Sequence, residues 1–373
     1  MKTIKHHFRQ KIFSLFLFLV SFTASWAQIP FGYYDNAEGK SERELKTALH
    51  NITRNGHIEL DFNANNARFW WDNYFRRTDW HPPTTSHPNG FFWCMYSTDS
   101  LTIYIDGNHQ NREHAMPRSW WSIGTSPNID YGFANGDLHN LFPANQTANA
   151  AKSNFPLGVV ANITFNNSVV RVGRSAINIP GYSGSVFEPP NEYKGDFART
   201  YLYMVTRYEN YAHRWRSIGT STMLQNNTYP TLTTYAINLL LEWHRADPVS
   251  DKERNRNDSV YQIQRNRNPF IDHPELAEHI WGNRVGTAWF RNSTIAEFGI
   301  NYLSSNVIEV SVSRRGNEAV RYEIYSVTGL RLLSGTLPGN NTLTLNDLNN
   351  GMYILVVYAG NQRYTARILV GRR

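Results

Sequence analysis

Residues 111–121 read NREHAMPRSWW and place a carboxylate, Glu113, directly beside a histidine, His114. In a regular β-strand, neighbouring side chains point to opposite faces of the sheet. Both side chains can therefore serve one site only where the backbone is bent or bulged, and the sequence predicts such a bend at these two residues. Because a Glu-His step is common, this stretch alone does not establish a catalytic site.

A second stretch, GDLHNLFPANQTANAAKSNFP at residues 136–156, carries further polar residues. Pro143 suits the first turn of a helix, where its missing N–H is harmless, and we expect a helix from there through Ala151. That helix would place Asn145 and Asn149 on one face, four residues apart. Asparagine is unfavourable inside an alanine-rich helix, which indicates a role other than helix formation.

Oxygen-bearing side chains of this kind suit a hard divalent cation. Magnesium takes one or two protein ligands and keeps waters that a phosphate can displace. A carboxylate and an amide oxygen would leave such positions open, and a neutral imidazole nearby could deprotonate water for attack on a phosphodiester. The two stretches together favour metal-dependent phosphodiester hydrolysis.

The composition indicates a globular protein, with 41% hydrophobic and 14% aromatic residues in a chain of 373. The single cysteine, Cys94, excludes an intrachain disulfide and a zinc site built from cysteines. The net charge is +7, but four of the 37 Lys and Arg residues precede residue 28 and eight follow residue 300. The part between is close to neutral, so nucleic-acid binding there requires a local cluster of positive charge.

The amino terminus has the pattern of a secretory signal peptide. Positive residues precede the apolar run IFSLFLFLVSF at residues 12–22, and SWA follows at residues 25–27. The run is short for a membrane span. We therefore expect residues 1–27 to be removed and the protein to be secreted or held at the outer cell surface.

Periodicity along the rest of the chain predicts an α+β fold class. We expect a mainly helical domain at residues 28–293, a linker at 294–302 and a small all-β sandwich at 303–373, where short strands are parted by Gly, Asn and Asp turns. Capping boxes begin two of the expected helices, at Ser41 with Glu44 and at Ser250 with Glu253. The expected helices are 41–55, 67–77, 195–210, 233–246 and 250–266, and the expected strands are 90–97, 101–107 and several within 157–186.

Four motifs in chain order resemble the secreted endonuclease I family over residues 33–283: NREHAMPRSWW, GDLHNLFPANQTANAAKSNFPLG, VFEPPNEYKGDFARTYLYM and RNRNPFIDHPELAEHIWG. Members of that family carry the ββα-metal, or His-Me finger, nuclease motif. The resemblance implies such a finger in the larger domain. It also implies an endonuclease that hydrolyses DNA to 5′-phosphate ends, with RNA as a further substrate.

Carried over residue by residue, the resemblance implies that His114 is the general base. Glu113 and Asn149 are then the ligands of Mg²⁺ or another divalent cation. His139 and Asn140 lie in the matching motif DLHN, and we expect them to support the site rather than to contact the metal.

The resemblance also implies an arginine near the scissile phosphate, for which Arg118 and Arg199 are the candidates. Backbone phosphate contacts are independent of base sequence and weaken with salt, so we expect little sequence specificity. A solvated helix face is the alternative interpretation of the basic residues near 254–267. The candidates for contacts to nucleic acid are Arg112, Lys152, Arg265 and Arg267.

The tail resembles the C-terminal sorting domains of proteins exported by type IX secretion. The segments YEIYSVTGLRLLSGTL and LTLNDLNNGMYILVVYAGNQRYTARILV carry that resemblance. It implies passage across an outer membrane with the secretion machinery as a partner, and we expect the enzyme to be a monomer.

Two alternatives remain open at this stage. One is another metal-dependent phosphoesterase that acts on smaller substrates. The other is a surface glycan- or DNA-binding protein on a nuclease-like fold, whose many aromatic residues contact the glycan. The joint presence of Glu113, His114 and Asn149 favours the nuclease.

Overall fold

The structure is a computed structural model, and it describes most of the chain after the predicted signal peptide. The described ranges are 29–30, 32–63, 67–97, 110–121, 131–176, 182–211, 222–291, 298–312, 319–339, 341–359 and 362–371. The signal peptide predicted at 1–27 and the strand predicted at 101–107 lie outside them. Within these ranges, no helix is long and apolar enough to cross a membrane.

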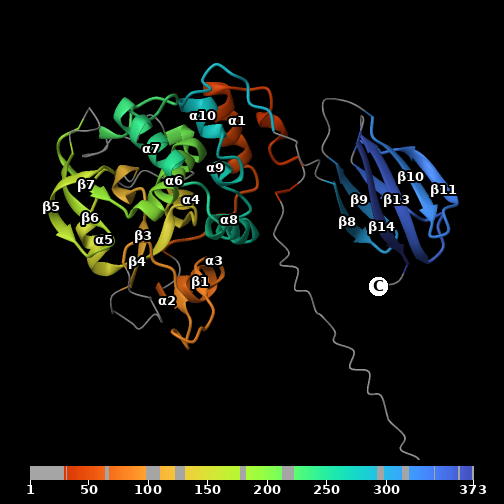
Figure 1. The fold of residues 1–373 in the computed structure, drawn as a ribbon, viewed down its shortest axis with the longest axis horizontal. Coiled ribbons are helices and arrows are strands. Elements are labelled where there is room, and N and C mark those ends of the chain that lie inside the picture. The colour runs from red at the N-terminus through yellow and green to blue at the C-terminus, as the bar shows by residue number, and fades with distance from the viewer. Residues whose placement is uncertain are drawn as a thin grey trace, which may run out of the picture.

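Helices make up much of the chain before residue 292 (Figure 1). The helices predicted at 41–55, 67–77, 195–210, 233–246 and 250–266 are present, although residues 67–77 include a π-helical turn, η2. The helical segments are α1 Glu42–Arg54, α2 Ala67–Trp70, η2 Trp71–Phe75, α3 Arg76–Thr78, α4 Tyr131–Gly136, α5 Gln146–Lys152, α6 Lys194–Arg207, α7 Thr234–Ala246, α8 Asp251–Gln264, α9 Pro269–Asp272 and α10 Leu276–Trp281, with 3₁₀ turns η1 Asp35–Ala37, η3 Arg118–Trp120, η4 Asn191–Tyr193 and η5 Glu209–Tyr211.

One of the two predicted capping boxes forms. At the start of α8 the Ser250 side chain accepts from the Glu253 N–H, and the Glu253 carboxylate accepts from the Ser250 N–H. The box predicted at Ser41 is wrong, because its side chain makes no cap hydrogen bond to α1. The chain enters α1 through Glu42 with φ of 50°, an unusual conformation for a residue other than glycine.

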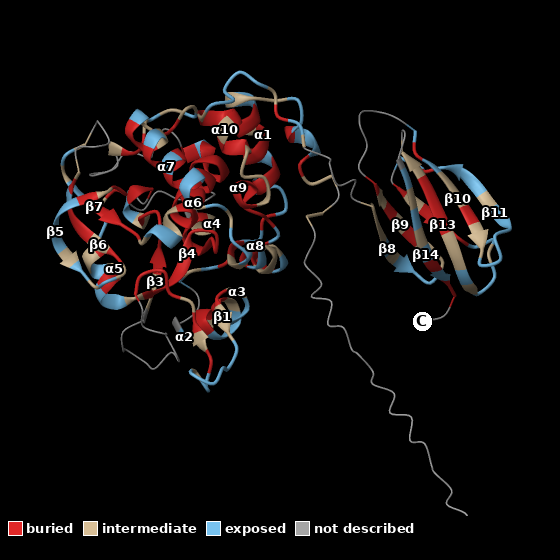
Figure 2. Ribbon diagram, in the orientation of Figure 1, coloured by how far each residue is buried: buried red, intermediate tan, exposed pale blue. Residues whose placement is uncertain are grey.

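Helix α6 lies at the centre of the larger hydrophobic core. Every residue from Gly195 to Arg207 is buried, so this helix is covered on all sides (Figure 2). It packs against α1, α7 and α9. The core also includes side chains from β4 and α5, so the two motifs from the sequence rest on the same framework.

Small antiparallel sheets surround this helical core. The strands predicted within 157–186 are present, whereas the strand predicted at 90–97 is reduced to two residues that pair with Trp80 and His81. The sheets are β1 Trp80–His81 with β2 Phe91–Phe92, β3 Gln110–His114 with β4 Leu141–Asn145, and β5 Val160–Asn166 with β6 Arg171–Ser175 and β7 Ser185–Glu188.

The C-terminal region is all β among its described residues and has a hydrophobic core of its own. Its strands form a four-stranded sheet, β11-β10-β13-β14, and a three-stranded sheet, β12-β9-β8. Residues 298–302, which the sequence assigned to a linker, lie in β8. The strands are β8 Phe298–Ser304, β9 Val307–Val312, β10 Arg321–Ser326, β11 Arg331–Thr336, β12 Thr342–Thr344, β13 Gly351–Ala359 and β14 Gln362–Val370.

Candidate active site at the β3–β4–α5 unit

Strands β3 and β4 form an antiparallel pair that joins the two motifs found in the sequence. All five residues of β3 are paired with β4 without a shift in register, so both Glu113 and His114 have a partner. The bend predicted at these two residues is therefore wrong, because regular pairing continues through them. The chain bends at residues 115–116, directly after the strand ends.

Helix α5 follows β4 directly but begins later than predicted. Pro143 lies in β4, which pairs on one side only, so its missing N–H is tolerated there. The helix begins at Gln146, and the Asn145 side chain caps it by accepting from the Ala148 N–H at 3.0 Å. The predicted pair of asparagines on one helical face is therefore wrong, and only Asn149 lies in the helix.

The carboxylate of Glu113 is buried and pairs with a lysine of α5. The Lys152 ammonium lies 2.5 Å from Oε1, and Lys152, the His114 backbone and the Asn149 side chain all act to lower the pKa of the carboxyl group. Burial raises the pKa of Glu113, and these contacts oppose that effect. The Asn149 side chain carries an amide oxygen, Oδ1, which is a ligand of the kind that a divalent cation binds.

The imidazole of His114 is buried and held in one tautomer. Its Nε2 lies 2.8 Å from the Asn135 carbonyl oxygen, so Nε2 carries the proton and Nδ1 has the lone pair. The ring centroid lies 5.2 Å from that of Phe62 and 5.7 Å from that of Trp121. Burial lowers the pKa of His114 to about 4, which keeps the ring neutral and able to accept a proton at pH 7.

Two arginines flank the ring of Phe62 beside this histidine. The guanidinium carbon of Arg112 lies 3.9 Å from the ring centroid and that of Arg118 lies 5.6 Å from it. After burial, both positive charges contribute to the lowered pKa of His114. The structure thus brings Arg112 and Arg118 to the imidazole, where positive charge could attract a phosphate group.

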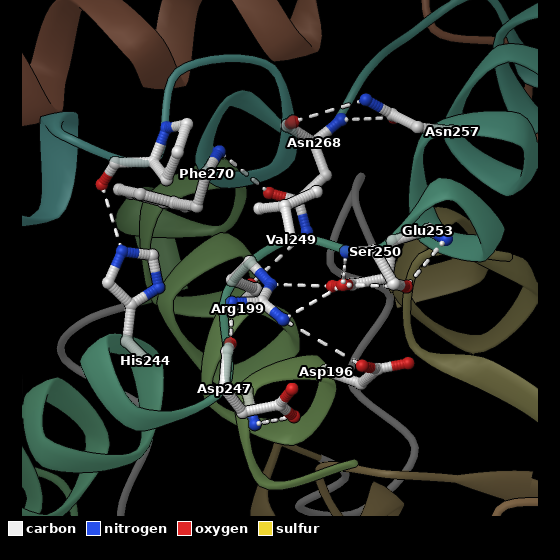
Figure 3. Close-up of polar contacts among 12 residues, drawn as sticks. Asp196, Arg199, His244, Asp247, Val249, Ser250, Glu253, Asn257, Asn268 and Phe270 are labelled. Atoms are coloured by element: carbon white, nitrogen blue, oxygen red, sulfur yellow. Dashed lines mark hydrogen bonds and ion pairs between the residues drawn. The ribbon is translucent and has the colours of Figure 1, made fainter. Parts of the chain in front are cut away.

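Arg199 lies in a different cluster, at the junction of α6, α7 and α8 (Figure 3). Its guanidinium binds Glu253 through Nε at 2.5 Å and Nη2 at 2.8 Å, and its Nη1 donates to the Asp247 carbonyl at 2.8 Å. The side chain is 1% exposed and also faces Asp196. These contacts join three helices, and the structure does not bring Arg199 to Glu113 or His114.

The four residues proposed to contact nucleic acid differ in exposure. Arg265 is exposed and Arg112 is half-buried. The Lys152 side chain has no exposed surface, and Arg267 is buried in ion pairs with Asp258 and Asp272, each at 2.7 Å. In this structure, Lys152 and Arg267 are therefore not on the surface that a nucleic acid would approach.

His139 and Asn140 occupy the turn that leads into β4. The Asn140 amide hydrogen-bonds to the backbone of Met116, two residues after His114. The His139 ring packs on Tyr203, and its Nε2 lies 3.2 Å from the Asn266 carbonyl oxygen. Asn140 thus contacts the backbone directly after β3, whereas the described contacts of His139 are with Tyr203 and Asn266; the supporting role of both residues stays a prediction.

The donor set fits a hard cation that keeps much of its water. Glu113 offers a carboxylate oxygen and Asn149 an amide oxygen, and both are ligands that magnesium accepts. Within the described ranges, no group of three or more His, Cys, Asp or Glu could hold a metal ion. The unit therefore does not resemble a structural zinc site, which needs four protein ligands.

Two contributors to the site, Phe62 and Asn135, were missed in the sequence, and Lys152 was named there in another role. Lys152 was expected to contact nucleic acid, although its spacing of three residues from Asn149 indicated a shared helical face. Phe62 lies far from both motifs in the chain, and Asn135 contributes only a backbone carbonyl. The pattern of side chains in a sequence does not indicate a contact that is made by a backbone carbonyl.

Comparisons with known proteins find similarity in both regions of the chain. Residues 41–275 match the family model of endonuclease I, and residues 304–371 match that of the secretion system C-terminal sorting domain. The extracellular ribonuclease of Bacillus subtilis (strain 168) is 34% identical over 253 residues, which cover 67% of this chain and 78% of the relative. An extracellular deoxyribonuclease of Aeromonas hydrophila is 26% identical over 172 residues, which cover 43% and 64%.

Proposed function

The chain belongs to the endonuclease I family and is a secreted nuclease with a C-terminal sorting domain, and from this we propose that Glu113 and Asn149 bind a divalent metal ion while His114 activates water. The β3–β4–α5 unit is then the ββα-metal finger of the enzyme. One observation carries the proposal: the buried Glu113 carboxylate, whose pKa the Asn149 side chain acts to lower, lies one residue away from a buried, neutral imidazole.

His114 acts through Nδ1, which accepts a proton from the attacking water. The hydrogen bond between Nε2 and the Asn135 carbonyl fixes the tautomer and the ring orientation that this step needs. With its pKa lowered to about 4, the imidazole is unprotonated at neutral pH. A bound phosphodiester brings negative charge, which favours the imidazolium and strengthens the base in the complex.

Glu113 and Asn149 supply the two protein oxygen ligands. A magnesium ion bound there would offset the charge that develops on the phosphodiester and on the leaving oxygen. Glu113 and His114 are the last two residues of β3, and the chain bends directly after them at residues 115–116. Arg118, with Arg112, neutralises the phosphate beside the imidazole.

The substrates we propose are DNA and RNA, cleaved with little sequence specificity to leave 5′-phosphate ends. Relatives named as extracellular ribonuclease and extracellular deoxyribonuclease support both kinds of nucleic acid. The arginines near His114 are suited to contacts with phosphate, which both polymers share.

A metal-binding and cleavage assay on the secreted protein tests this proposal. We expect E113Q and N149A each to weaken Mn²⁺ binding at least tenfold and to reduce the nicking of plasmid and the hydrolysis of RNA. The matched control is Q146A, an exposed residue of the same helix, which should behave as the wild type. Unchanged Mn²⁺ binding in both site variants would overturn the assignment of the ligands.

A further inference from the structure

Lys152 contacts both of the adjacent residues of the candidate site. Its ammonium lies 2.5 Å from Oε1 of Glu113 and donates to the carbonyl oxygen of His114 at 3.1 Å. The Lys152 side chain is 0% exposed. One buried cation thus holds the side chain of Glu113 and the backbone of His114.

A lysine in this environment requires an explanation beyond stability. Removing an ammonium and a carboxylate from water carries a desolvation penalty that can exceed the attraction between them. A buried ion pair is therefore weak evidence for a contribution to folding. Both described acceptors of the Lys152 ammonium belong to Glu113 and His114, which points to a role in the site.

The geometry of α5 gives this role a physical basis. Asn149 and Lys152 lie three residues apart, on one face of the helix; the Lys152 ammonium contacts the Glu113 carboxylate, and both side chains act to lower the pKa of that group. A glutamate side chain has several rotatable bonds, and pairing of the β3 backbone does not fix them. The ammonium on Oε1 restrains the carboxylate and leaves Oε2 for another ligand.

We propose that Lys152 is a positioning residue, which orients the Glu113 carboxylate and the Glu113–His114 backbone for metal binding. This inference rests on the proposed function, because it gives Lys152 its role through Glu113. Hydrogen-bond partners of metal-ligating carboxylates orient them, and their loss typically weakens metal affinity by about 10–100-fold.

The chain contains a closely matched control. Lys46, a residue of α1, is also 0% exposed, and its ammonium lies 2.9 Å from the carboxylate of Glu209 in η5. Replacing Lys46 removes a buried ion pair of the same kind without touching Glu113. A general loss of stability would therefore affect K46M and K152M alike.

The experiment measures Mn²⁺ binding to the mature full chain without nucleic acid, by titration calorimetry and by the paramagnetic resonance signal of free Mn²⁺. Folding of each variant is checked by circular dichroism. We expect K152M to weaken Mn²⁺ binding by about 10–100-fold, K152R to recover most of the affinity, and K46M to match the wild type. If K152M does not fold, K152Q, which keeps an N–H donor, takes its place with the same expected direction.

Mn²⁺ binding within twofold of the wild type in folded K152M or K152Q would overturn the inference. An equal loss in K46M would also overturn it, because the effect would then be general. E113Q and N149A separate this result from the proposed function. If they lose Mn²⁺ binding while K152M does not, only the role of Lys152 fails, whereas unchanged binding in E113Q and N149A removes the metal site itself.

Discussion

The side chain of Asn140 forms hydrogen bonds to both the backbone N–H and the backbone carbonyl of Met116. Its Oδ1 accepts from the Met116 N–H at 2.8 Å, and its Nδ2 donates to the Met116 carbonyl at 3.2 Å. The Asn140 backbone carbonyl also accepts from the Ala115 N–H at 2.9 Å. The turn before β4 thereby fixes the chain at the two residues that follow His114, where the strand ends and the backbone bends.

Replacing this asparagine should affect both stability and activity. N140A leaves the buried N–H of Met116 without its partner, and we expect the free energy of unfolding to fall by about 1–3 kcal/mol. Nuclease activity per folded molecule should also fall, because the backbone beside His114 loses a restraint. Asn268 provides the control, since it is buried, caps α9 and lies outside the candidate site. N268A with the same loss of activity would contradict the local role of Asn140.

Arg199 should matter for folding and not for catalysis. R199M removes the partner of a buried carboxylate, Glu253, and such a loss typically costs about 3–5 kcal/mol. Denaturant unfolding should register this cost, while the cleavage rate of the folded fraction stays near that of the wild type. A rate at least 100-fold lower in folded R199M would return this arginine to the candidates for the phosphate contact.

Buried histidines should make the protein less stable in mild acid. Burial lowers the pKa of His139 and of His244 to about 4 from the usual value of 6.5. Between these values the unfolded chain binds protons that the folded chain does not, so stability falls as the pH drops from 6.5 towards 4. Each site can contribute about 3 kcal/mol. Unfolding measured at pH 7, 5.5 and 4.5 should show this slope, and H139Q should flatten it; equal slopes in the two proteins would contradict the assignment.

The arginine beside the imidazole should determine part of the salt dependence of binding. R118A is expected to lower the slope of log K against log salt concentration by about 1, because one phosphate contact is lost. Fluorescence anisotropy with a labelled oligonucleotide in chelator measures binding without cleavage. Arg284 is exposed and follows α10, so R284A serves as the control. An unchanged slope in R118A would remove this residue from the phosphate contact.

The elements that local pattern determines could be predicted from the sequence. The helix at 250–266 has both a capping box and regular periodicity, and α8 begins at Asp251 directly after Ser250. Alternation and turn residues likewise predicted the all-β C-terminal region. The prediction that a helix begins at Pro143 was wrong because proline suits both the first turn of a helix and a strand that is paired on one side. Pairing with β3 makes this residue part of a strand.

Exposure and partners of charged residues could not be predicted in the same way. Nothing in the sequence indicated partners for three positively charged residues, and each is paired with a carboxylate in the structure: Lys152, Arg199 and Arg267. The partner of Arg199 lies 54 residues away and that of Lys152 lies 39 residues away, so no local spacing reveals them. The adjacent pair Glu113 and His114 was singled out from residue type and order in the motif, and its role in catalysis stays a prediction.

The most direct test of the account is the magnesium-dependent nicking of supercoiled plasmid by the mature protein and by H114A. Loss of the general base should lower the rate by about 10²–10⁴-fold, and chelator should abolish the wild-type activity. The control is H87A, which removes a histidine from the loop between β1 and β2 and should retain the full rate. Nicking by H114A at the wild-type rate would contradict the assignment of His114 as the base.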